Sequence, residues 1–388
     1  MPYLDHAATT PLREEVLDAM LPFLREAWGN PSSLHGPGRR ARVAVDRARE
    51  RVARVLGCEP GEVVFTSGGT EADNLALRGA LAGMRRQSGR GGLVTSAVEH
   101  EAVLQTAHAL EEEGGDVTVL PPDADGRIAV AAVAGAVNET TGLVSVMLVN
   151  NEIGTVNPVG DIADAAHAAG ALVHTDAVQA AGLLVVDVDA LGVDLLSLSG
   201  HKVGGPKGVG ALVVRAGTPF RAVQTGGSQE RRRRGGTENV AGIVCFAEAL
   251  ALAAEEREAT AARLTALRDA LRQRLVEALG ERLVVNTPTS GAAPHVLSVS
   301  IRPGPGGPVD GEMLLTALDL EGVHVSAGSA CTSGALEPSH VLQALGLPRD
   351  VAGATVRFSM GRTTTDADVT EAKSALIRVL ERLDAVAV

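Results

Sequence analysis

The sequence predicts an α/β protein that has a mostly parallel sheet flanked by helices and a smaller α+β domain toward its C-terminal end. Two observations lead to this fold class. Short apolar runs alternate with helix-like segments through the first two-thirds of the chain. Hydrophobic residues make up 45% of the 388 residues but aromatic residues only 2%, so the core must consist of Ala, Val and Leu. At this length we expect about two or three domains.

The expected strands are short runs rich in Val and Leu. They are residues 62–67, 92–97, 141–150, 171–178, 193–200 and 208–215. Helical segments lie between them at residues 71–84, 101–114 and 161–170. Strands that alternate with helices in this way predict a parallel sheet with helices on both faces.

From about Gly242 the pattern changes. Residues 243–283 form one long amphipathic stretch, and its high Ala content favours a packed helix over a coiled coil. We expect this helix to connect a large domain, residues 14–255, to a small domain made of residues 1–13 and 256–388. Strands of the small domain are predicted at residues 295–301 and 355–360, and the Gly- and Pro-rich residues 302–311 form a loop.

Charge and hydropathy exclude several classes of protein. The formal net charge is −12, which argues against nucleic acid as the primary ligand. No apolar stretch of the sequence is long and uncharged enough to span a bilayer, and the first residues lack the apolar run of a signal peptide. We therefore expect a soluble, cytoplasmic protein that binds neither membranes nor nucleic acid directly.

Cysteine and lysine are both scarce. The three cysteines, Cys58, Cys245 and Cys331, are too few and too widely spaced for a disulfide framework or a zinc cluster, so no metal site is predicted. Only three of the 35 basic residues are lysines, and two of these, Lys202 and Lys207, lie within the segment SGHKVGGPKG. A lysine, unlike an arginine, is readily made neutral and nucleophilic by its surroundings. This segment is therefore a candidate for chemistry.

Three segments carry polar groups at the ends of predicted strands. The turn containing Gly68, Gly69 and Thr70 leads from a strand into a helix, where backbone N–H groups can bind an oxyanion, although taken alone a plain strand–turn–helix corner is the better explanation. Asp176 follows another strand; it is either a ligand group or a helix N-cap. Lys202 follows a third strand, with Lys207 as its rival.

Together these parts describe a pyridoxal 5'-phosphate site. Lys202 would bind the cofactor as a Schiff base, Asp176 would pair with the pyridinium nitrogen, and the glycine-rich turn would hold the phosphate.

The whole chain resembles the cysteine desulfurases of the NifS/IscS type, which belong to the class V aminotransferase superfamily of PLP fold type I. The segments that carry this resemblance run from end to end. They are YLDHAATTP, NPSSLHGPG, FTSGGTEADNLA, VEHEAVL, VNNEIGTVNP, HTDAVQAAG, SGHKVGGPKGVGAL, GGSQERRRRGGTENV, GSACTSGALEPSHVLQALG and VRFSMGRTTT.

The resemblance implies a role for each matching residue. The phosphate would be bound by Gly69, Thr70, Ser199 and His201, and by Thr237 of the other subunit, which implies a homodimer. His100 would stack on the cofactor ring and assist proton transfers, although by itself it is typical of an ordinary histidine at a helix start. Asn151 and Gln179 would lie beside the phenolic oxygen of the ring. Arg357, otherwise a surface strand residue, would clamp the substrate carboxylate together with Asn151.

The same resemblance implies the reaction. L-cysteine would give L-alanine, and its sulfur would be held as a persulfide on Cys331 before it passes to an acceptor protein, either an iron–sulfur scaffold or a thiolation enzyme. Cys331 lies among small residues that cannot bury it, so we expect it on an exposed, mobile loop. Cys245 is expected in the core and Cys58 near a helix end.

Several alternatives stay open. The chain can be interpreted instead as another class V enzyme, such as a selenocysteine lyase or an aminotransferase, or as a sulfur-relay module without enzymatic activity. The basic run Arg231 to Arg234 is interpreted as a loop at the subunit interface, with nucleic-acid binding as the alternative. His6 stands where many members of the family carry Asn, and it is interpreted as neutral variation.

Overall fold

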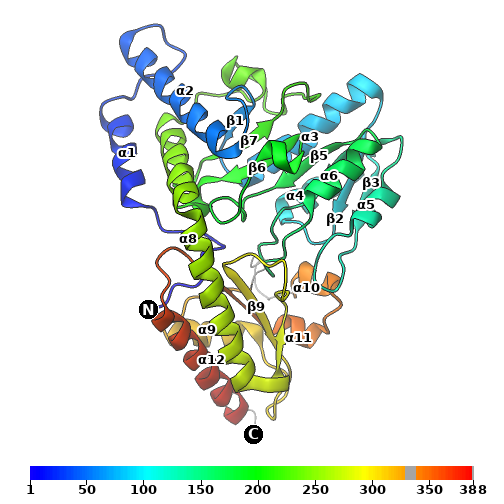
Figure 1. Cartoon of the computed structure of the whole chain (residues 1–388), viewed down its shortest axis with the longest axis vertical. Coiled ribbons are helices and arrows are strands. Elements are labelled where there is room, and N and C mark those ends of the chain that lie inside the picture. The colour runs from blue at the N-terminus through cyan, green and yellow to red at the C-terminus, as the bar shows by residue number, and fades with distance from the viewer. Residues whose placement is uncertain (328–337, 387–388) are drawn as a thin grey trace.

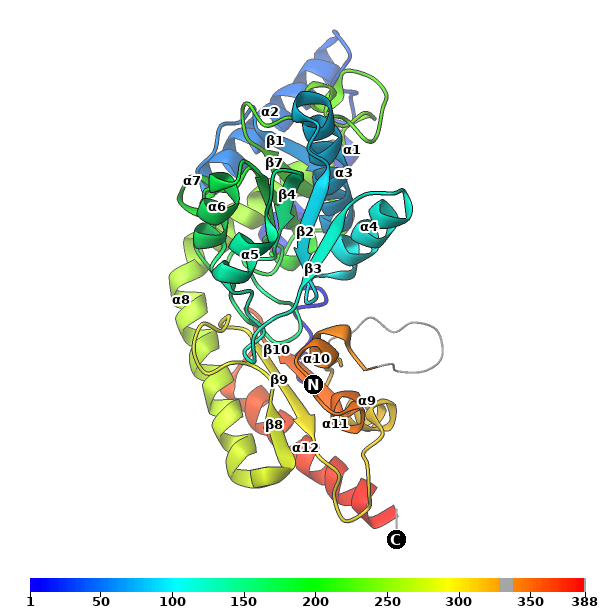
Figure 2. The ribbon, with the colours of Figure 1, turned by 90° about the vertical axis from the view of Figure 1, so that its right-hand side faces the viewer.

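The computed structural model describes residues 1–327 and 338–386. In this part of the chain there are two sheets, one in the upper and one in the lower part of the molecule in Figures 1 and 2, and one long helix runs alongside both of them. The sheets belong to separate hydrophobic clusters, so each is the centre of its own core.

The large sheet has seven strands in the order β1-β7-β6-β5-β4-β2-β3. Their bounds are β1 Val63–Thr66, β2 Gly92–Ser96, β3 Val117–Leu120, β4 Thr141–Ser145, β5 Leu172–Asp176, β6 Leu195–Ser199 and β7 Gly210–Val214. β7 pairs antiparallel with β6 and β1, and the other neighbours pair in parallel. The short connection from β6 to β7 contains no crossover helix, which explains the one reversed strand. The predicted mostly parallel sheet is confirmed.

Helices cover both faces of this sheet because strand side chains alternate between them. Val64 belongs to the cluster beneath α3 and α4, whereas its neighbours Val63 and Phe65 belong to the cluster on the opposite face. The first face is covered by α3 Gly69–Ser88 and α4 Glu101–Glu112. On the other side lie α1 Glu14–Arg25, α2 Gly36–Leu56, α5 Val130–Ala136, α6 Val159–Ala168 and α7 Val188–Leu191. The sequence analysis did not assign α1, α2, α5, α7 or β3.

The predicted long helix is α8, Val240–Leu279, with 40 residues. Its N-cap Asn239 accepts a hydrogen bond from the Gly242 amide at 3.1 Å. Leu250 in its first half packs in the core of the large sheet, whereas Leu264 and residues beyond it pack in the core of the small sheet. At 1.5 Å per residue the helix is about 60 Å long, and Figure 1 shows it extending along both parts.

The small sheet is antiparallel, in the order β10-β9-β8. Its elements are β8 Leu283–Val285, β9 Val296–Ile301, α9 Gly311–Leu320, α10 His340–Ala344, α11 Arg349–Gly353, β10 Thr355–Ser359 and α12 Asp366–Val386. The described part of the chain also has the 3-10 turns η1 Gly200–Lys202, η2 Gln229–Arg232 and η3 Gly280–Arg282. The strands predicted at 295–301 and 355–360 are therefore confirmed, whereas β8 was not predicted.

The N-terminal residues pair with the small sheet. The amide of Ser359 donates to the carbonyl of Leu4 at 2.7 Å, and the Leu4 side chain lies in the core of the small sheet. Val341 and Leu342 of α10, by contrast, pack in the large core. The division into residues 14–255 and the remainder stays a proposal.

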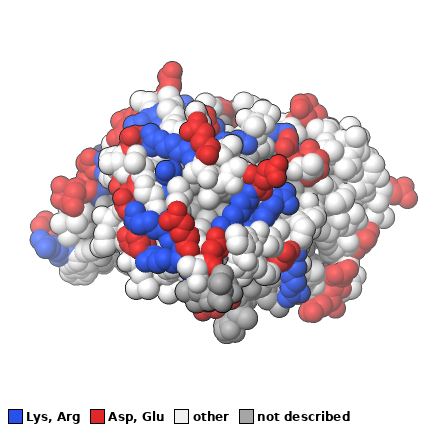
Figure 3. Space-filling model, turned by 90° about the horizontal axis from the view of Figure 1, so that it is seen from below, with Lys and Arg blue, Asp and Glu red and all other residues white. Residues whose placement is uncertain are grey.

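The described surface has no strong segregation of charge on the face seen in Figure 3, where acidic and basic side chains are interspersed. None of the helices within residues 1–327 and 338–386 combines the length and the apolar character needed to cross a bilayer.

Candidate active site

The predicted residues meet where β1, β5 and β6 end, at the edge of the large sheet that faces the small one. Ligand groups are usual at the carboxyl ends of such strands. The turn after β1 leads into α3, which begins at Gly69. A Cβ at Gly69 would lie 3.0 Å from Cγ2 of Val178 and 3.7 Å from Cβ of Ser199, so glycine allows the helix start to approach β6 closely.

This turn lies beside Ser199, and together they could hold an anion. The Ser199 side chain is buried, and its hydroxyl has no hydrogen-bond partner among the described residues. A buried polar group without a partner is costly, and the free N–H groups of the α3 N-terminus lie beside it. The arrangement fits a phosphate group that would accept from both.

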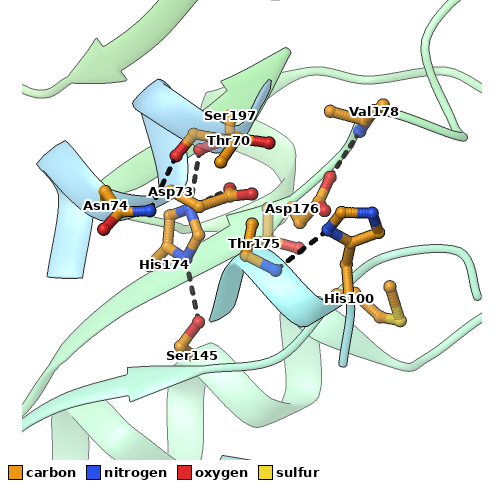
Figure 4. A network of polar contacts seen from close by, with 12 residues as sticks. Thr70, Asp73, Asn74, His100, Ser145, His174, Thr175, Asp176, Val178 and Ser197 are labelled. Carbon is orange, nitrogen blue, oxygen red and sulfur yellow. Dashed lines mark hydrogen bonds and ion pairs between the residues drawn. The ribbon is translucent and has the colours of Figure 1, made fainter. Parts of the chain in front are cut away.

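Asp176 ends β5 and is 6% exposed. Its Oδ1 accepts a hydrogen bond from the Val178 amide at 2.8 Å, which closes a turn and does not cap a helix. Burial raises the pKa of the Asp176 carboxyl, whereas His100 and Lys202 lower it. Figure 4 shows His100 facing Asp176, so both line the same site.

Lys202 lies in η1 directly after β6. Its Nζ donates to the backbone carbonyl of Ala7 and, at 2.8 Å, to that of Ala8. Burial lowers the pKa of Lys202 to about 8, and the charge of Arg357 acts in the same direction, against the carboxylates of Asp176 and Asp5. Lys207 is exposed. The position therefore favours Lys202 over its rival.

His100, Gln179 and His201 lie in the same region as Asp176 and Lys202. The Nδ1 of His100 accepts from the Ala102 amide at 3.1 Å, so the residue caps α4 as well as facing Asp176. Gln179 donates to the same Ala7 carbonyl as Lys202, at 2.9 Å. Burial, followed by the charge of Lys202, lowers the pKa of His201 to about 4, so its ring is neutral at pH 7.

Arg357 is a buried residue of β10, and the alternative of an exposed strand residue is wrong. Its Nη1 donates to the carbonyl of Asn151 at 2.9 Å, and its Nη2 donates to Oδ1 of Asp5 at 2.7 Å. These two contacts fix the guanidinium plane at the mouth of the site. Its Nε has no partner among the described residues, so the group retains donor capacity for a carboxylate.

The structure also shows contributors that the sequence analysis missed. Asp5, Ala7 and Ala8 come from the N-terminal segment, and they contact Arg357 and Lys202. The segment YLDHAATTP was recognised as a matching motif, but nothing in its residue types indicates that two backbone carbonyls would hold a lysine. His6 lies in the same segment, and burial lowers its pKa to about 4; the interpretation of this position as neutral variation stays a prediction.

Comparisons with known proteins agree with this geometry. The family profile described as Aminotransferase class-V matches residues 2–371. The chain belongs to this family. A cysteine desulfurase IscS from Dictyoglomus turgidum is 45% identical over 381 residues, covering 98% of this chain and 95% of that protein. A solved NifS-like protein has a TM-score of 0.90 at 37% identity, over 98% of this chain and 99% of that one. A structure of SspA in complex with cysteine has a TM-score of 0.80 at 36% identity, over 93% and 99%.

Membership of the class-V aminotransferases, among cysteine desulfurases of the IscS/NifS type, confirms the predicted fold, enzyme class and cofactor. The residues present fit pyridoxal phosphate. The buried, unpartnered hydroxyl of Ser199 and the α3 N-terminus suit its phosphate, the buried Asp176 suits its ring nitrogen, and Lys202 suits its aldehyde.

Two of the predicted residues are not placed at this site by the described structure. Cys331 lies outside the described residues, whose nearest members are Ala327 and Pro338. Thr237 is exposed in the loop before α8, and its expected reach to another subunit stays a prediction.

The basic run before Thr237 is partly internal to the chain. Arg234 pairs with Glu71 in the first turn of α3 at 2.7 Å, and Arg233 donates to backbone carbonyls at 3.2 Å. Arg231 and Arg232 are exposed. This basic run therefore offers fewer free cations than its sequence indicates.

The two described cysteines are poor nucleophiles. Cys245 is fully buried in α8 and Cys58 follows the end of α2, as predicted. Burial raises the pKa of each thiol to about 12. Because the thiolate is the reactive form, neither is suited to accept sulfur.

Proposed function

We propose that the protein removes sulfur from L-cysteine, releases L-alanine, and holds the sulfur as a persulfide on Cys331 until an acceptor protein takes it. One observation carries the proposal. A lysine whose pKa is lowered to about 8 lies between a buried carboxylate, Asp176, and the guanidinium of Arg357. This arrangement combines a base, a cofactor anchor and a substrate clamp within one site.

The binding steps follow from these side chains. The substrate carboxylate would compete with Asp5 for Arg357, whose fork can bind it through two N–H groups. Asn151 lies beside this fork because its carbonyl accepts from Arg357. The cofactor phosphate would be held by Gly69, Thr70, Ser199 and His201.

The proton transfers are assigned to Lys202 and His100. When bound, pyridoxal phosphate supplies an electron sink for the substrate α-carbon. At pH 8 about half of the Lys202 amine is neutral, and this form can take the α-proton from the substrate and return it. His100 faces Asp176 across the site and would assist at the carbon that loses sulfur. Gln179 donates to the same Ala7 carbonyl as Lys202. It would therefore help to hold the cofactor ring so that one of its faces is turned toward the lysine.

The sulfur step is assigned to Cys331. Its thiolate would attack the substrate sulfur, so that an S–S bond forms while the C–S bond breaks and the carbon fragment takes a proton to become alanine. The length of the chain allows this. Cys331 lies five residues after Ser326, which pairs with Arg357 across the sheet edge, and five extended residues reach about 17 Å. On the other side, Ser339 donates to the buried carboxyl of Glu152, next to Asn151.

Three finer points belong to the same proposal. We assign the protein as a cytoplasmic homodimer in which Thr237 of each subunit binds the phosphate held by the other. The exposure of Thr237 supports this assignment, because an exposed side chain is accessible to a second copy. The sulfur acceptor is a protein, either a scaffold for iron–sulfur clusters or a thiolation enzyme. The relative solved in complex with cysteine, SspA, supports cysteine as substrate.

The test is alanine and sulfide release from L-cysteine in the presence of a thiol reductant. We expect Cys331→Ser to bind the cofactor but to lose sulfur release, whereas Cys58→Ser, the matched control, keeps it. An aminotransferase would keep its activity in Cys331→Ser, and a selenocysteine lyase would act on selenocysteine while sparing cysteine. A wild-type protein that is yellow but forms no alanine would contradict the proposed reaction.

A further inference from the structure

Next to the candidate cofactor site lies a buried polar row to which the proposed reaction assigns no role. His174 precedes Asp176 by two residues on β5, so both side chains project from the same face of the sheet. The register places Ser145 of β4 opposite His174, and Ser197 of β6 opposite Asp176. Asp73, in the second turn of α3, covers the row from above (Figure 4).

The row is closely connected. The His174 ring has its Nδ1 2.9 Å from Oγ of Ser145 and its Nε2 2.9 Å from Oγ of Ser197. Oδ1 of Asp73 lies 3.6 Å from the same Nε2 and has no hydrogen-bond partner among the described residues. His174 is 0% exposed and Asp73 1% exposed, so water does not screen the charges here.

Two carboxyl groups, Asp73 and Asp176, share this buried region, and two such groups close together do not both ionise without compensation. The surroundings of one of them favour its ionised form. His100, the Val178 amide and Lys202 all favour the ionised form of Asp176.

The surroundings of Asp73 are different. Burial is the main cause that raises the pKa of its carboxyl, and the carboxylate of Asp176 and, where it is ionised, the carboxyl group of Glu99 add to it. A hydrogen bond with Ser197 favours the ionised form, but it is a single contact with a neutral group. The carboxyl of Asp73 therefore lacks a cationic partner such as Lys202, which favours the ionised form of Asp176.

His174 does not supply the missing positive charge. Burial lowers the pKa of its ring to about 3, so the imidazole is neutral at pH 7. Its two nitrogens are then one donor and one acceptor between the two serines. An ionised Asp73 could only accept a hydrogen bond from this row, whereas a protonated Asp73 can also donate to it.

We propose that Asp73 is a neutral carboxylic acid in the folded protein, and that by holding the proton it lets Asp176 stay ionised for the cofactor's ring nitrogen. In this proposal Asp73 is a positioning residue, which acts through the charge of Asp176 and contacts neither cofactor nor substrate. The second half of the proposal rests on the proposed role of Asp176, whereas the protonation state of Asp73 does not depend on it.

The test is infrared spectroscopy of the full-length protein at pH 7, before and after loading with pyridoxal phosphate. A protonated carboxyl group gives a carbonyl band that an ionised one lacks, and labelling with ¹³C-aspartate shifts only the bands of aspartates. We expect Asp73→Asn to lose one aspartate band, and the matched variant Asp176→Asn to lose none. Glu99→Gln calibrates the method, because burial raises the pKa of Glu99 to about 8 and the protonated glutamate band should disappear.

The opposite pattern would overturn the proposal. This is a band lost in Asp176→Asn and kept in Asp73→Asn, or a ¹⁵N spectrum in which His174 is a charged imidazolium paired with ionised Asp73. If Asp73→Asn does not fold, the labelled wild-type protein still decides, because the absence of any protonated aspartate at pH 7 contradicts the proposal. The bands are measured without turnover. The protonation state of Asp73 can therefore be determined even if the desulfurase assay fails.

Discussion

The lowered pKa of Lys202 can be measured directly, because the chain contains only three lysines. With a pKa of about 8 in place of 10.5, the neutral amine at pH 7 is about 300 times more abundant. Only the neutral amine reacts with acetic anhydride. In the cofactor-free protein we therefore expect Lys202 to be acetylated with a midpoint near pH 8, as measured by mass spectrometry of its peptide. Lys207, which is exposed on the same segment, is the internal reference.

Two variants test the physical cause. Removing the charge of Arg357 in Arg357→Gln should raise the midpoint of Lys202, because that charge disfavours the ammonium form. Asp176→Asn should lower the midpoint further, because the carboxylate favours the ammonium form. The reasoning is refuted if Lys202 and Lys207 show the same pH dependence, or if both substitutions move the midpoint in the same direction.

Three further results are expected. Ser199→Ala should weaken binding of pyridoxal phosphate by about 10- to 100-fold in equilibrium titration, since a hydrogen bond to a charged group contributes about 1.5–3 kcal/mol; unchanged affinity would remove Ser199 from the phosphate site. Glu230→Ala should lower the free energy of unfolding in urea by about 3–5 kcal/mol, because it leaves Arg49, paired to it by two contacts of 2.7 Å, buried without a counter-charge. Glu321→Ala, which leaves only the exposed Arg378 and Arg382 without a counter-charge, serves as its control and should cost less. Thr237→Ala should weaken cofactor binding without changing the dimer seen by light scattering, and equal affinity would argue that the loop does not reach the other subunit's site.

Much of the fold could be predicted because its signal is local. The apolar runs that became β1, β2, β4 and β5 are separated by helix-like segments, and this alternation predicts parallel pairing, whereas β7 follows β6 through a short connection without a crossover helix and pairs antiparallel. The exceptions are local as well. β3 has mostly exposed or half-buried residues at the sheet edge, and β8 has only three residues, so neither carries the apolar pattern of a central strand.

The chemistry of the site was predictable in part. Lys202, Asp176 and the glycine turn each follow an apolar strand, and in a parallel sheet such ends lie on one edge. Lysine scarcity singled out the segment of Lys202, but its spacing alone did not separate Lys202 from Lys207. Burial did so, since Lys202 is held by the carbonyls of Ala7 and Ala8 whereas Lys207 is exposed.

The sequence by itself determined the fold class, the family and the set of residue types at the site, because motifs and periodicity are properties of the chain in order. The tertiary structure determined the protonation equilibria and the orientation of the charged groups at the site. The pKa of Lys202, the orientation of Arg357 by Asp5, and the position of Asp73 beside Asp176 depend on burial and on groups far apart along the chain. Electrostatic energies depend on the distance between groups and on the exclusion of water, and neither can be derived from the order of the residues.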